Sequence, residues 1–253
     1  MDEHKVRLEI SELSKSYETK EGRFQAVEKI DLKVYDNEFL VLLGPGNCGK
    51  TVLLNMIAGL EQPTSGEIRL DGSVIQGSDR RIGMVFQKLA LMPWKTVMQN
   101  TEIGPKFRGV KKEERRKKAQ SYIDLVGLNG FEKAYPAQLS GGMKQRVGIA
   151  RAYTNDPEIL LMDEPFGALD AQTRFVMEQE VQRIWEQEKR TIIFVTNNIE
   201  EACFLGDRIV LFSECPARMK EIYVNDLKRP RDVISQEFLK LRAMISDNTD
   251  LAL

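Results

Sequence analysis

The residues with the clearest chemical potential form a glycine-rich octapeptide at positions 44–51. Its members are Gly44, Pro45, Gly46, Asn47, Cys48, Gly49, Lys50 and Thr51. The order matches G-x-x-x-x-G-K-[ST], a pattern in which backbone N–H groups surround phosphates, the lysine contacts the outer phosphates and the hydroxyl binds magnesium. A chance glycine-rich turn is the alternative interpretation. The pattern predicts a phosphate loop in which Lys50 and Thr51 take the last two roles.

One part of this octapeptide is unusual. Gly46 and Asn47 stand where Ser-Gly is commoner in such loops. Glycine and asparagine both tolerate positive φ, so we expect the backbone to keep its anion-binding curl.

Two adjacent carboxylates, Asp163 and Glu164, follow the apolar run 159–162. Such a run is typical of a parallel strand buried on both faces, and ligands bind at the carboxyl ends of parallel strands. Beside a phosphate loop, Asp163 is a candidate magnesium partner and Glu164 can polarise a water molecule. A helix-capping pair is the alternative. Gln87 ends the predicted strand 82–86, where it could sense a metal or a water, or be a hydrogen-bonded structural amide.

Two further positions could contact a nucleotide. Ser140, Gly141 and Gly142 precede a helical pattern, and a serine cap with two glycines at a helix N-terminus favours an anion. Tyr17 precedes a polar turn at 18–23 and could stack on a purine. A half-buried strand aromatic explains Tyr17 equally well.

The elements that must position these residues follow from the apolar patterns. A short strand at 39–43 leads into the phosphate loop, and a helical pattern follows at 52–58. Alternating residues before 35 predict an antiparallel β layer. Later strands and helices alternate, with strands at 159–162, 191–196 and 209–212 and helices at 112–126, 172–190 and from 199 onward. We therefore expect an α/β fold with a right-handed parallel core.

Residues 1–253 are predicted to form a single domain. A helical subdomain is expected at about 88–155. A polar tail follows at about 214–253, and the sequence does not indicate its role. In the segment 87–94 the apolar side chains Leu89, Leu91, Met92 and Trp94 predict contact with a membrane partner. Burial of Trp94 in the core is the competing interpretation.

Composition excludes several other functions. Lysine and arginine number 37 against 38 acidic residues, so the net charge of -1 gives no reason to expect nucleic-acid binding. Cys48, Cys203 and Cys215 lack metal-ligand spacing, which predicts a reducing compartment without disulfide or zinc. The charged segment 1–5 does not resemble a secretory signal, and no apolar run approaches the roughly 20 residues that span a bilayer. Any membrane role would be peripheral.

Five features follow one another along the chain: the phosphate loop, Gln87, the segment 139–146, the pair Asp163-Glu164, and Asp170. In this order they resemble the motifs of the ATP-binding cassette (ABC) ATPases, a group of P-loop NTPases. The resemblance extends over roughly residues 6–235. The segments 85–87, 91–94, 135–138 and 165–170 resemble those of the nitrate/sulfonate/taurine importer group. The resemblance implies a parallel-sheet core with an antiparallel β layer and a helical subdomain.

The same resemblance implies a dimer of ATPase subunits on the cytoplasmic face of a membrane. ATP would lie between one subunit's loop and the other's Ser140-Gly141-Gly142, with Mg2+ at Thr51, Gln87 and Asp163, the last through water. Glu164 would polarise the attacking water, and Gln87 would couple the site to an integral-membrane permease. A solute-binding protein would act indirectly.

One departure from the family concerns Asn197, where the family carries a histidine that contacts the γ-phosphate. The only histidine in this chain is His4, and Asn198 likewise replaces a frequent aspartate. Asparagine can donate one N–H bond to phosphate but cannot carry charge or relay a proton. Two functions are therefore expected: an ATPase that drives an importer of small solutes, or a slow regulatory cassette, paired with a competent partner.

Overall fold

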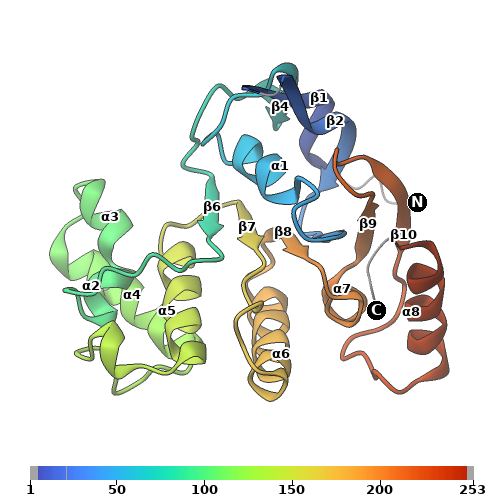
Figure 1. Ribbon diagram of the computed structural model, residues 1–253. Helices are drawn as coiled ribbons and strands as arrows, with labels where there is room; N and C mark the ends of the chain where they lie inside the picture. The colour runs from blue at the N-terminus through green and yellow to red at the C-terminus, as the bar shows by residue number, and fades with distance from the viewer. Residues whose placement is uncertain (1–4, 21, 250–253) are drawn as a thin grey trace. The chain divides into compact units, whose positions relative to one another are not determined.

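The computed structural model describes residues 5–20 and 22–249. His4 and the rest of the N-terminal segment 1–4 lie outside the described residues, as does the end of the tail, 250–253. The chain divides into two compact units (Figure 1). The first unit comprises the residues up to Asp79 together with those from Thr191 onward, and the second comprises Arg80–Arg190. Each unit is described by itself below.

The first unit begins with an antiparallel sheet in the strand order β2-β1-β4-β5. Its strands are β1 (Val6–Thr19), β2 (Gly22–Tyr35), β4 (Ser65–Leu70) and β5 (Ser73–Val74). The predicted antiparallel layer is therefore confirmed. The hairpin turn is shorter than predicted, because Glu18 pairs with Arg23 and Thr19 with Gly22.

A second set of strands in this unit has the order β10-β9-β3-β8. Its members are β3 (Phe39–Leu43), β8 (Thr191–Thr196), β9 (Arg208–Phe212) and β10 (Met219–Val224). β3 runs parallel to both neighbours, with Val41 opposite Phe194 and Ile209. Every residue of β3 is buried, as an uninterrupted apolar run predicts. The predicted parallel core is confirmed, and after β3 the residues 44–49 lead into α1 (Lys50–Ile57), which is labelled in Figure 1.

The tail proves to be a folded part of the first unit. It contains β10 and α8 (Gln236–Asn248), and α8 packs against α7 (Ile199–Leu205). The buried Arg231 donates hydrogen bonds to the carbonyls of Cys203 at 3.1 Å and Phe204 at 2.8 Å. The last carbonyls of a helix lack intrahelical donors and form the negative end of its dipole, so a guanidinium stabilises the end of α7.

The second unit contains two parallel strands, β6 (Ile82–Val85) and β7 (Ile159–Asp163), with Met84 opposite Leu161. Its helices are α2 (Val97–Thr101), α3 (Ile103–Phe107), α4 (Lys112–Leu125), α5 (Gly141–Tyr153) and α6 (Ala171–Glu188). α5 contacts α2, α4 and α6, and α2 to α5 form one helical cluster (Figure 1). The amphipathic spacing that predicts α4 is confirmed by burial of Ala119, Tyr122 and Ile123.

An irregular segment follows β6. Trp94 is 71% exposed there, so burial of this ring in the core of the described chain, one of two sequence-based interpretations, is wrong. Leu91 and Met92 are half-buried. Within residues 5–20 and 22–249, no helix combines the length and the apolar character required to cross a membrane.

Candidate nucleotide site

The phosphate loop leaves the buried end of β3 and enters α1. Asn47 has φ 60° and Gly49 has φ 114°, so both adopt the left-handed backbone that these residue types tolerate. A Cβ on Gly49 would lie 2.4 Å from the Ala26 carbonyl oxygen, which leaves room for glycine alone. Asn47 therefore adopts the positive φ that the sequence allows, whereas Gly46 does not.

Lys50 is the charged group of this loop. Its side chain is buried, and Nζ donates hydrogen bonds to the carbonyls of Gly44 at 2.7 Å and Pro45 at 2.6 Å. Two neutral carbonyls orient the ammonium without neutralising its charge, so that charge is still available to an anion. Thr51 is exposed in the first turn of α1, where its hydroxyl can reach a ligand.

Tyr17 lies in β1 and is half-buried. Its hydroxyl donates to Glu61 Oε1 at 2.5 Å, and Lys15 Nζ lies 5.0 Å from the ring centroid. Burial, followed by the hydrogen bond and charge of Glu61, raises the pKa of Tyr17 to about 12. The phenol therefore stays protonated at neutral pH and holds the ring in place. The structure shows a half-buried strand aromatic, and stacking on a purine stays a prediction.

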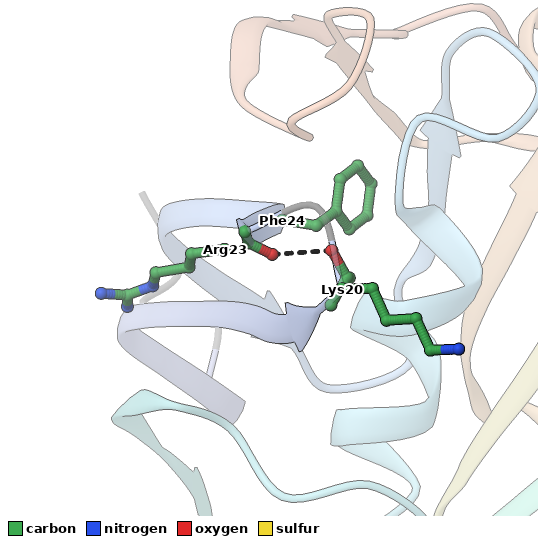
Figure 2. Close-up of a pocket in the computed structure, with 5 residues that line it drawn as sticks. Lys20, Arg23 and Phe24 are labelled. Carbon is green, nitrogen blue, oxygen red and sulfur yellow. Dashed lines mark hydrogen bonds between the residues drawn. The ribbon is translucent and has the colours of Figure 1, made fainter.

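The tip of the β1–β2 hairpin forms a pocket beside Tyr17. The pocket has a volume of about 490 Å³, and Figure 2 shows the residues that line it, Thr19, Lys20, Gly22, Arg23 and Phe24. Thr19 Oγ1 donates to the Gly22 carbonyl at 2.7 Å and closes the tip. Phe24 pairs across the strands with Tyr17 and is 49% exposed. The lining combines an exposed ring with the cationic side chains of Lys20 and Arg23, groups that suit a nucleoside base and its phosphates. Sequence patterns did not single out this pocket.

Asn197 follows β8 in the first unit, and its side chain is exposed. The turn after it is held by the buried Thr196, whose hydroxyl accepts from the Asn198 N–H at 3.0 Å and donates to the buried Glu201. Asn198 caps α7 by accepting from the Glu201 N–H at 3.1 Å. Aspartate would cap equally well, so this replacement is structurally neutral. The spacing of Asn198 and Glu201 is that of a capping motif and could have revealed this network.

The carboxylates lie in the second unit. Asp163 is the last residue of β7 and is 5% exposed. Glu164 has φ 39°, a left-handed conformation that costs about 1–3 kcal/mol outside glycine and persists mainly at functional sites. Gln87 Nε2 donates to Glu164 Oε2 at 3.3 Å. Two predicted site residues that are far apart in the sequence are therefore in contact.

The predicted anion-binding residues Ser140, Gly141 and Gly142 lie at the start of α5 in the same unit. Ser140 caps the helix by accepting from the Met143 N–H at 3.3 Å, and Ser140 and Gly141 are exposed. A Cβ on Gly142 would lie 3.1 Å from Thr173 Cγ2, so a larger residue would press on α6. The exposed, capped N-terminus can face an anion.

The candidate metal ligands are a hydroxyl, an amide oxygen and a carboxylate, from Thr51, Gln87 and Asp163. These are hard oxygen donors, which fit Mg2+, an ion that takes few protein ligands and completes its shell with phosphate oxygens and water. The described part of the chain offers no other binding site for a metal ion, because no group of three or more His, Cys, Asp or Glu residues there could hold one. Thr51 belongs to the first unit and the other two to the second.

Comparison with known sequences links these features to one family. The profile described as ABC transporter matches residues 27–167. An uncharacterized ABC transporter ATP-binding protein of Methanocaldococcus jannaschii is 51% identical over 244 residues, which cover 96% of this chain and 91% of the relative. An aliphatic sulfonates import ATP-binding protein of Bacillus thuringiensis is 41% identical over 242 residues, 95% of this chain and 94% of the relative.

Solved structures agree with the sequence matches. The dimeric structure of a bacterial ABC transporter cassette has a TM-score of 0.76 and 33% identity, and the match covers 86% of this chain and 98% of that one. A post-hydrolysis dimer of the same cassette, bound to ADP and Pi, matches with the same TM-score of 0.76. The neighbours thus share both the fold and the nucleotide chemistry predicted from the loop.

Proposed function

Because the chain belongs to the ABC transporter family and is an ABC-type ATPase, we propose that it drives the uptake of a small solute of the nitrate, sulfonate or taurine kind. The observation that carries this proposal is the match, along nearly the whole chain, to a relative named for aliphatic sulfonate import. The protein would act on the cytoplasmic face of the membrane, attached to permease subunits. A solute-binding protein would deliver the solute to the permease.

The first unit provides the groups for binding ATP. The N–H groups of residues 44–51 surround the phosphates, Lys50 contacts the outer ones and Tyr17 stacks on the base. Thr51 of this unit, together with Gln87 and, through water, Asp163 of the second unit, would hold Mg2+, which would neutralise phosphate charge. The left-handed backbone at Asn47 and Gly49 supports this assignment.

The second unit provides the groups for hydrolysis. Glu164 polarises the attacking water, and its contact with Gln87 Nε2 restrains the carboxylate that accepts the water's proton. Ser140, Gly141 and Gly142 bind the γ-phosphate of the ATP held by a second subunit. The exposed cap at the start of α5 supports that role.

The segment 87–94 is proposed as the contact with the permease. A photo-crosslinking residue in place of Trp94 should capture a permease subunit in the assembled complex, because this ring is exposed in the segment that begins with Gln87. The same probe in place of Phe175, a 43% exposed aromatic on α6, is the matched control. Equal capture from both positions, or capture from Phe175 alone, would place the docking surface elsewhere.

The import function has a direct test. An adjacent permease gene and a gene for a solute-binding lipoprotein would identify the partners for reconstitution in vesicles. We expect the binding protein loaded with a sulfonate, taurine or nitrate to stimulate ATP hydrolysis by the complex. Stimulation by none of these solutes would reject the proposed substrate class while leaving the ATPase assignment in place.

A second candidate function is favoured by one residue. Asn197 cannot carry charge, so the subunit could be a slow regulatory cassette or depend on a competent partner cassette. Asn197→His should raise the ATPase rate about tenfold with unchanged nucleotide affinity. The loss of one transition-state donor costs about 2.7–4 kcal/mol, and the hydrogen bond of the native amide offsets part of that.

The matched control is Asn197→Gln, which keeps a neutral amide. A rise confined to the histidine variant, measured as phosphate release, supports a slow native cassette. An unchanged rate in Asn197→His means that asparagine suffices, or that residue 197 does not face the nucleotide.

A further inference from the structure

Two of the three cysteines lie on neighbouring segments of the first unit. Cys48 is buried in the phosphate loop, whereas Cys215 is exposed in the turn that joins β9 to β10. This turn is attached to β2, because the Ala217 N–H donates to the Ala26 carbonyl at 2.9 Å and the Ala217 carbonyl accepts from the Glu28 N–H at 3.0 Å. The turn therefore has a fixed place in the unit.

The phosphate loop lies against the same place. A Cβ built on Gly49 would be 2.4 Å from the Ala26 carbonyl oxygen and 3.1 Å from Ala217 Cβ. These distances leave no room for even one added carbon, so the end of the loop, β2 and the turn pack directly together. The residue before Gly49 is Cys48, and Cys215 is two residues before Ala217.

Cys215 also contacts the strand that covers the loop. The Cys215 thiol donates to the Gln25 carbonyl at 3.7 Å, on the stretch of β2 that covers the loop. Burial and then the charge of Cys48 raise the pKa of Cys215. Lys50 Nζ lies 3.6 Å from Cys48 Sγ. An ammonium at this distance attracts the negative charge that a sulfur carries when it reacts as a nucleophile.

The third cysteine differs from Cys215 because it is buried. Cys203 is buried in α7, and burial raises its pKa to about 12. A thiol in such a setting is inert at neutral pH. Cys203 is therefore a natural internal control.

We propose that Cys48 and Cys215 are a peroxide-sensitive pair that closes to a disulfide and blocks nucleotide binding. The exposed Cys215 sulfur attacks one oxygen of hydrogen peroxide, the O–O bond breaks, and sulfenic acid and one water form. The Cys48 sulfur then attacks the sulfenic sulfur, an S–S bond replaces the S–O bond, and the second water leaves with the Cys48 proton. Two thiols lose two electrons, and peroxide is reduced to two waters.

The consequence for the loop rests on the proposed binding of ATP at residues 44–51. A bond from Cys48 to the turn displaces the backbone N–H groups that surround the phosphates. A thiol reductant reverses the bond by exchange. The affinity for nucleotide then becomes dependent on the redox state of these two residues.

The test treats the wild-type protein with hydrogen peroxide, alkylates the remaining thiols and analyses unreduced peptides by mass spectrometry. We expect a linked Cys48–Cys215 peptide and an affinity for a fluorescent ATP analogue that is weakened at least about tenfold, the loss of one charge-assisted hydrogen bond. Dithiothreitol should restore the affinity. Cys215→Ser should keep its affinity under peroxide, and Cys203→Ser should behave as the wild type.

Oxidation of Cys215 to sulfinic acid without a linked peptide would overturn the proposal. A linked peptide with unchanged affinity would overturn its functional part. Failure of the reduced protein to bind the analogue would instead contradict the proposed function, and the peptide analysis reports on the disulfide independently of that result.

Discussion

Lys50→Ala is expected to weaken ATP binding about 10²-fold or more, the usual result of removing one partner of a buried, hydrogen-bonded charge pair. Lys50 is buried and oriented by the carbonyls of Gly44 and Pro45, and the loop contains no other cation. Affinity is measured by titration with a fluorescent ATP analogue. Because the side chain is buried, the melting temperature must be measured alongside.

Lys50→Met separates charge from packing, since it keeps most of the length of the side chain. It should bind ATP as weakly as Lys50→Ala while melting closer to the wild type. Lys117→Ala, which removes an exposed lysine from α4 in the second unit, is the control and should bind normally. Wild-type affinity in a folded Lys50→Met variant would remove the phosphate-loop assignment.

Glu164→Gln is expected to keep ATP binding and to lower the hydrolysis rate by about 10²–10⁴, the contribution of a positioned general base. The amide preserves the shape of the side chain and its contact with Gln87 but loses the charge that polarises water. Phosphate release and nucleotide affinity are measured on the same sample. The variant should accumulate as an ATP-bound dimer in gel filtration.

Glu113→Gln is the matched control, because it removes one exposed carboxylate from the same unit at the start of α4. Its turnover should equal that of the wild type. Equal turnover in Glu164→Gln would mean that another group activates the water, and Gln87→Ala would then be the next variant to measure.

The local patterns predicted the parts of the fold that are continuous in sequence. The apolar runs of β3, β7 and β8 are buried throughout, because both faces of each strand are covered. The positive φ of Asn47 was likewise predictable, because the ability of asparagine to adopt it is a property of the residue type. The nucleotide-binding family followed from the order of short motifs, each of which coincides with a strand end or a helix start.

What could not be predicted depends on contacts between distant segments. In the sequence, Arg231 is one charged residue of a polar tail. In the structure its side chain is buried, because it donates hydrogen bonds to the carbonyls at the end of α7. The left-handed backbone of Glu164 has no signal in its residue type. The attachment of Ala217 to β2, which brings Cys215 to the phosphate loop, joins segments about 190 residues apart and has no periodicity to reveal it.

We propose that two subunits form each hydrolytic site, with the phosphate loop from one and Ser140-Gly141-Gly142 from the other, and that two copies of this ATPase can supply both. The most direct measurement is the rate of phosphate release from MgATP, per subunit, over a range of protein concentrations that spans monomer and dimer. We expect a rate per subunit that rises with concentration and levels off as dimers form, because a lone subunit lacks half of the proposed site. A rate per subunit that stays constant down to concentrations where only monomers are present would contradict it.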